Sequence, residues 1–275
     1  MPMRWMWAAA VALSVLVLAA LHTIAPLLEI LKQQVKLDGA EVAAIGTSLM
    51  GSGLAWNADL LHTGRAAQRL ALGAMQADQA LDIAEESLRQ GAQIIVIEAQ
   101  PFLYSLRQQR HRQRNLWGES HHDWRQQLSL QVSQALRQTL LHALGIHRPR
   151  WYTDLPTDPE FAIDTAALQR FPPPLIEPPH AARLTMLIEA TAMQGVHLLF
   201  VVMPISATGA DIDGLSYRQA FIDHAHRFAA AYGVELWIPT FAWPDSHFYD
   251  RAHMNATGRA RFTAALSRYL TDEPT

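Results

Sequence analysis

The order of apolar and polar positions along the chain predicts strands that alternate with helices. Apolar runs without polar alternation occupy 42–45, 94–97, 196–204 and 234–239. Such runs are typical of strands covered on both faces, and 70–73 is a further, shorter candidate. Helical spacing predicts helices over 49–61, 76–90, 180–194, 217–232 and 255–270. This alternation favours an α/β fold with a central parallel sheet of about five strands between two helix layers.

The first 37 residues differ from the rest of the chain. No charged residue occurs from Trp5 to Ile24, and this apolar run has about the length, roughly 20 residues, that a bilayer core requires. An amphipathic stretch follows up to Leu37. A cleaved signal peptide is the alternative, but the span is longer than a usual signal core. We therefore expect a transmembrane anchor with a juxtamembrane helix at 1–37 and one globular domain at 38–275. The charges at the two ends of the span do not fix its orientation.

The region at about 104–179 interrupts the alternation and is predicted to be an insertion. Four arginines between positions 107 and 114 form a basic run, for which a solvated helix face is the simplest interpretation. The His-His-Asp triplet at 121–123 does not predict a metal site, because adjacent histidines point to different faces of a helix and no second cluster of ligands is apparent. The proline-rich part, 148–179, is expected to lack regular structure.

Composition narrows the function classes. Hydrophobic residues make up 50% and charged residues 17% of the 275 residues, and the amino-terminal run accounts for this apolar excess. A formal net charge of −3 provides no overall basic field, so we expect no nucleic-acid partner. The absence of cysteine excludes disulfides, zinc-thiolate sites and thiol nucleophiles.

Candidate chemistry follows the first and the last predicted strands. Ser48 stands directly after the first strand, and Asp250 precedes His253 by three positions after the last. The carboxyl ends of parallel strands share one edge of a sheet, so these residues are expected to meet. A serine hydroxyl becomes a nucleophile when an imidazole takes its proton and a carboxylate orients that imidazole. The order predicts a catalytic triad, although a serine before a helix is also a common N-cap and Asp-x-x-His is frequent by chance.

Two blocks resemble those of the SGNH (GDSL-like) hydrolase superfamily. Gly46-Thr47-Ser48-Leu49 is similar to its Gly-Asp-Ser-Leu block with threonine at the second position, and Asp250-Arg251-Ala252-His253 is similar to its terminal Asp-x-x-His block. Gly73 falls where the family has its second-block glycine. The usual Gly-x-Asn-Asp of the third block is replaced by Glu98-Ala99-Gln100-Pro101, which leaves Gln100 to supply the side-chain amide. The resemblance spans 42–270, with 104–179 unmatched.

Within this superfamily, the chain looks most like membrane-anchored proteins that accompany alginate O-acetylation and teichoic-acid D-alanylation. The resemblance implies a flavodoxin-like three-layer α/β/α sandwich, no cofactor or metal, and a Ser-His-Asp esterase or O-acyltransferase that acts on an extracytoplasmic polysaccharide. It also implies that Leu49, Gly73 and Gln100 bind the oxyanion or the substrate.

The resemblance further implies where the protein acts and with what. The domain is expected on the periplasmic or extracytoplasmic side of the inner membrane. Expected partners are an acylated glycan, the membrane itself and a membrane-bound acyltransferase or synthase. The alternative function is a non-catalytic accessory or binding subunit of an exopolysaccharide synthesis or secretion complex. The altered third block favours this alternative, and the intact serine, aspartate and histidine oppose it.

Overall fold

The computed structural model describes residues 37, 39–55, 57–60, 63–72, 75–104 and 171–272. Contacts divide the chain into two compact units, and all of these residues belong to the unit that comprises 36–120 and 150–275. The expected anchor at 1–37 apart from Leu37, the arginine run and the His-His-Asp triplet lie outside the described residues. Among the helices that are described, none is both long and apolar enough to span a bilayer.

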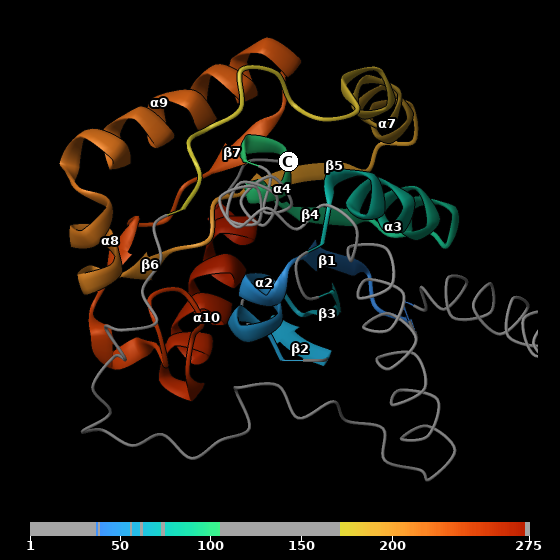
Figure 1. The fold of residues 1–275 in the computed structure, drawn as a ribbon. Coiled ribbons are helices and arrows are strands. Elements are labelled where there is room, and N and C mark those ends of the chain that lie inside the picture. The colour runs from blue at the N-terminus through green and yellow to red at the C-terminus, as the bar shows by residue number, and fades with distance from the viewer. Residues whose placement is uncertain are drawn as a thin grey trace, which may run out of the picture. The chain divides into compact units, whose positions relative to one another are not determined.

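A single six-stranded sheet forms the centre of this unit (Figure 1). Its strands are β1 (Val42–Gly46), β2 (Asn57–Leu60), β3 (Arg65–Ala71), β4 (Ile94–Glu98), β5 (His197–Val201) and β7 (Glu235–Trp237), in the order β2-β3-β1-β4-β5-β7. All neighbours are parallel except β2, which pairs antiparallel with β3. The predicted parallel sheet of five strands is therefore confirmed, and without β2 its order is the doubly wound 2-1-3-4-5.

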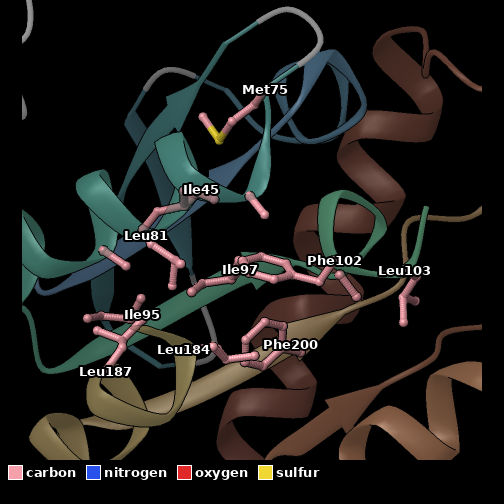
Figure 2. Close-up of a cluster of buried hydrophobic side chains, with 14 of the residues drawn as sticks. Ile45, Met75, Leu81, Ile95, Ile97, Phe102, Leu103, Leu184, Leu187 and Phe200 are labelled. Carbon is pink, nitrogen blue, oxygen red and sulfur yellow. The ribbon is translucent and has the colours of Figure 1, made fainter. Parts of the chain in front are cut away.

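Helices cover both faces of the sheet, as Figure 1 shows. They are α3 (Ala77–Arg89), α7 (Ala181–Met193) and α9 (Leu215–Tyr232) on one face, and α2 (Ser48–Gly53) and α10 (Ala256–Asp272) on the other. Ile45, Ile97 and Phe200 point into the first core cluster (Figure 2). Val96 and Val201, one position away, belong to the second. Successive side chains of a strand alternate between faces, so a strand covered on both sides needs apolar residues throughout.

The prediction for the region between β1 and α3 is wrong. The expected helix over 49–61 ends at Gly53, β2 follows it, and the third strand of the chain covers Arg65–Ala71 rather than 70–73. A buried arginine gives the reason: Nη1 of Arg69 donates to the carbonyl oxygens of Gly51 and Leu54, at 2.6 Å each. This contact satisfies one carbonyl of the last turn of α2 and that of its C-cap residue Leu54, and so favours the end of the helix. It joins residues far apart in sequence, which a local pattern does not reveal.

The remaining predicted helices agree with α3, α7, α9 and α10 within two residues at each end. Short elements after the strands were not predicted, because two to seven residues show no clear periodicity. These are α4 (Gln100–Leu103), β6 (Ile205–Ser206), α8 (Ala207–Asp213), β8 (Ala242–Trp243) and the 3₁₀ helix η3 (Asp245–His247). They extend the chain beyond β4, β5 and β7, at the edge where the candidate site lies.

The proline-rich segment returns to the sheet beside the point where the chain leaves it. Its described end, 171–179, forms neither helix nor strand. The Leu175 N–H donates to the carbonyl oxygen of Leu103 at 2.7 Å. The rings of Tyr104 and Phe171 lie 5.2 Å apart between their centroids. The two ends of the region between them are thus held together by the described part of the chain.

Candidate active site

Ser48 stands at the tight turn between β1 and α2. Thr47, not Ser48, is the N-cap of this helix, because the Thr47 Oγ1 accepts a hydrogen bond from the Leu49 N–H at 3.1 Å. The Ser48 hydroxyl is therefore not used as the cap. Within 42–54, Ser48 is also the one residue that is not buried. The turn exposes a serine at the carboxyl edge of an otherwise buried strand and helix.

Gly46 is needed in this turn because it has no side chain, and not because its backbone adopts a positive φ. A Cβ at position 46 would lie 2.5 Å from Oε2 of Glu98 and 2.6 Å from the Cβ of Met50. Both distances are shorter than side-chain carbon contacts allow, and the second atom belongs to the adjoining helix. Only glycine lets α2 and β4 approach the end of β1 this closely.

Asp250 and His253 occupy a compact loop between η3 and α10. Oδ1 of Asp250 accepts hydrogen bonds from the backbone N–H groups of Ala252 at 2.9 Å and of His253 at 2.7 Å. Oδ2 of the same carboxylate lies 2.7 Å from Nδ1 of the His253 ring. One carboxylate therefore both folds the loop and orients the imidazole.

A β-bridge and a helix cap hold this loop in place before α10. Phe248 and Met254 form an antiparallel bridge across the loop. Asn255 caps α10, since its Oδ1 accepts from the N–H groups of Thr257 and Gly258 at 3.0 and 3.1 Å. This cap fixes the start of α10 directly after the loop of Asp250 and His253.

The structure brings the serine and the histidine together across 205 positions of sequence. Nε2 of His253 lies 2.9 Å from Oγ of Ser48. With Nδ1 directed at the Asp250 carboxylate, these partners assign the ring proton to Nδ1 and leave Nε2 as the acceptor of the serine proton. The side chains of His253 and Asp250 are 22% and 37% exposed, so a substrate can reach the site from solvent. This arrangement has the contacts that nucleophilic acyl transfer needs.

The environment of Asp250 keeps its carboxyl ionised. Burial alone would raise its pKa, but the hydrogen bond and charge of His253, together with the two loop N–H groups, hold the pKa below its usual value. An ionised Asp250 at neutral pH can stabilise the imidazolium that forms when His253 takes a proton.

Ser52 connects the two halves of the site. Its Oγ donates to the Leu49 carbonyl oxygen at 2.9 Å within α2 and accepts from the Met254 N–H at 3.0 Å. Ser52 is buried, and Met254 is the residue next to His253. The hydroxyl therefore fixes the distance between the helix that carries Ser48 and the loop that carries His253.

Ser52→Ala is expected to lower kcat for an activated acetyl ester about tenfold and to leave KM nearly unchanged, since about 1.4 kcal/mol of positioning corresponds to that factor. Steady-state kinetics with p-nitrophenyl acetate measure the effect. Ser87→Ala is the matched control, because the buried Ser87 hydroxyl also donates to a carbonyl of its own helix, that of Ile83 in α3, on the other face of the sheet. An equal loss of kcat in both variants would contradict the role of Ser52.

The three residues expected to bind the oxyanion or the substrate have different positions. The Gln100 side chain is buried and pairs with the backbone of Met203: its Nε2 donates to the carbonyl at 3.1 Å, and its Oε1 accepts from the N–H at 3.3 Å. The Leu49 N–H donates to Thr47. Gly73 lies outside the described residues. The Gln100 amide and the Leu49 N–H therefore donate to other groups of the protein, whereas both were expected to donate to the oxyanion or the substrate.

Glu98 is a site residue that the sequence analysis missed. Glu98 is the last residue of β4, and its side chain is fully buried. Its Oε2 accepts hydrogen bonds from the backbone N–H groups of Thr47 at 2.7 Å and Met50 at 3.2 Å. The Thr47 hydroxyl donates to Oε1 at 2.7 Å. Burial raises the pKa of Glu98 to about 7, against the opposing effect of these hydrogen bonds and of the charge of His253. An acidic residue at the end of a buried apolar run was the available signal.

Within the described ranges, no cluster of three His, Cys, Asp or Glu side chains could hold a metal ion. No family model and no curated protein matches the chain.

Two solved structures resemble the chain over most of its length. A candidate acylhydrolase from Bacteroides fragilis NCTC 9343 has a TM-score of 0.40 and 10% identity, covering 86% of this chain and 88% of that one. A GDSL-like lipase from Bacteroides thetaiotaomicron VPI-5482 has a TM-score of 0.38 and 7% identity, covering 87% and 91%. At these identities and TM-scores, neither similarity assigns a family or an activity to this chain.

Proposed function

We propose that this protein is a serine esterase or O-acyltransferase of the SGNH type. One observation carries the proposal: Ser48, His253 and Asp250 form a continuous hydrogen-bonded series, with 2.9 Å between Ser48 and His253 and 2.7 Å between His253 and Asp250. The strand order and the two sequence blocks that resemble this superfamily support it. All three residues are partly exposed, as a site that a substrate enters from solvent requires.

In the proposed reaction, Oγ of Ser48 attacks the acyl carbon of an ester while Nε2 of His253 takes the hydroxyl proton. The negative charge that develops on the carbonyl oxygen is stabilised by the Ser48 N–H, for which the described residues contain no other acceptor. The His253 imidazolium, stabilised by Asp250, then protonates the departing alcohol, which leaves an acyl-enzyme. Water or a sugar hydroxyl, deprotonated by His253, then attacks this acyl group; the bond to Oγ breaks, and His253 returns the proton to Oγ of Ser48.

The acceptor decides between hydrolase and transferase. We extend the proposal to ester groups of an extracytoplasmic polysaccharide, with the domain held at the inner membrane by the apolar run from Trp5 to Ile24 and with a membrane-bound acyltransferase or synthase as partner. The length of this run and the resemblance to membrane-anchored acylation proteins support this extension.

A membrane-impermeant fluorophosphonate on intact cells that produce the full chain tests both chemistry and sidedness. We expect the wild-type protein to be labelled and the Ser48→Ala variant to remain unlabelled, because the probe phosphonylates an activated serine. Labelling only after the cells are permeabilised would contradict the extracytoplasmic location but retain the chemistry. Failure to label folded wild-type protein under either condition would instead favour the accessory-subunit function.

A further inference from the structure

Most of the backbone N–H groups around Ser48 donate hydrogen bonds to acceptors inside the protein. Those of Thr47 and Met50 donate to Oε2 of Glu98, and that of Leu49 donates to the Thr47 hydroxyl. The Thr47 hydroxyl is itself bonded to Oε1 of Glu98. One buried carboxyl therefore holds three of the four donors from 47 to 50, two directly and one through Thr47. The remaining donor is the N–H of Ser48.

The surroundings keep the Glu98 carboxyl in this position. It has no exposed surface, so water cannot replace its partners. The missing Cβ of Gly46 leaves the space for Oε2, which would lie 2.5 Å from such an atom. The Thr47 hydroxyl stabilises the Glu98 carboxylate by donating a hydrogen bond to it. An acidic residue at position 47 would instead place a second carboxylate beside it, and the two negative charges would repel each other. The charged or titratable groups that act on Glu98 are His253 of the catalytic loop and Tyr104 beyond α4.

We propose that Glu98 is the positioning residue of the nucleophile turn: its carboxyl occupies the N–H groups of Thr47 and Met50 and thereby presents the Ser48 N–H to the oxyanion. This inference rests on the proposed esterase function. Glu98 does not contact the substrate. It acts through the turn, so its loss affects the transition state more than it affects binding of the ground state.

The first test compares two replacements of similar size. Glu98→Gln retains an oxygen for the two N–H groups, whereas Glu98→Met has the same length without an oxygen acceptor. With p-nitrophenyl acetate and the full-length protein, we expect Glu98→Met to lower kcat about 100-fold with KM changed less than about threefold, on the scale of losing one oxyanion donor. Glu98→Gln is expected to stay within about tenfold of the wild-type kcat.

A second pair of variants keeps the proposal testable if Glu98→Met does not fold. Thr47→Val removes the hydroxyl that links Leu49 to Glu98, and Thr47→Ser restores it. We expect Thr47→Val to lower kcat at least about tenfold at constant KM and Thr47→Ser to stay within about threefold of the wild type. Thr191→Val is the matched control, because the buried Thr191 hydroxyl bonds only carbonyls of its own helix, α7. Its kcat is expected to equal that of the wild type.

The outcomes separate this inference from the proposed function. Wild-type protein without esterase activity or fluorophosphonate labelling would refute the function itself. An active wild type together with a Glu98→Met variant that keeps kcat within about threefold would overturn only the role of Glu98. Equal losses in Thr47→Val and Thr191→Val would do the same, because they would reduce the effect to general stability.

Discussion

Ser48→Ala is expected to hydrolyse p-nitrophenyl acetate at least about 10⁴-fold more slowly than the wild type, the scale of loss seen when the nucleophile of a serine relay is removed. The variant lacks Oγ, so no acyl-enzyme forms. Its residual activity comes only from the backbone N–H of position 48 and from water activated by His253. The hydroxyl lies at a partly exposed position and does not cap α2, so the melting temperature should change little. Steady-state kinetics and thermal denaturation of the same preparations measure both effects.

Two further variants sharpen this prediction. His253→Ala should lower kcat to nearly the same level as Ser48→Ala, because residues of a relay act as a unit. Ser246→Ala, at an exposed position of η3 in the same region, removes an identical hydroxyl and should retain full activity. Equal rates for Ser48→Ala and wild-type protein would remove the catalytic role assigned to this serine.

The second large effect concerns stability and pH. The folded protein holds the pKa of Glu98 at about 7, compared with the usual 4.5 for a solvated glutamate in the unfolded chain. Between these values the folded state keeps a proton that the unfolded state has released. The free energy of unfolding is therefore expected to fall as pH rises from 4.5 to 7, with about 3 kcal/mol lost above pH 7.

Asp250 contributes with the opposite sign. Its pKa is lowered in the folded state, so the stability that it provides is present near neutral pH and is lost as pH falls through its folded pKa. Glu98→Gln isolates the Glu98 contribution, because the amide does not titrate while Asp250 is unchanged. Chemical denaturation at pH 5 and pH 8 measures the difference. If both proteins lose the same free energy between these pH values, the carboxyl of Glu98 does not titrate in this range.

The central sheet and the residues of the candidate triad were predictable from sequence because each rests on a local pattern and one general rule. Unbroken apolar runs located β1, β4 and β5, and the meeting of carboxyl ends in a parallel sheet placed Ser48 beside the loop of Asp250 and His253. The spacing of three positions between Asp250 and His253 was enough to predict that they lie together, since one short loop folds around the carboxylate.

The parts that were missed depend on contacts distant in sequence. Glu98 and Thr47 are 51 positions apart, and Ser52 meets Met254 across 202 positions. The same limit applies to Arg69, which marks the end of α2 from a neighbouring strand. From the sequence, the serine was a possible N-cap, whereas the cap is Thr47, whose hydroxyl also donates to the distant Glu98.

The bond between Leu175 and Leu103 and the contact of Phe171 with Tyr104 have a consequence for how this chain can vary. They join the end of the described segment 75–104 directly to the start of 171–272, so the sheet edge that carries Ser48, Asp250 and His253 does not depend on 105–170 for this junction. We therefore expect changes of length within 105–170 to leave the geometry of Ser48, Asp250 and His253 unaltered.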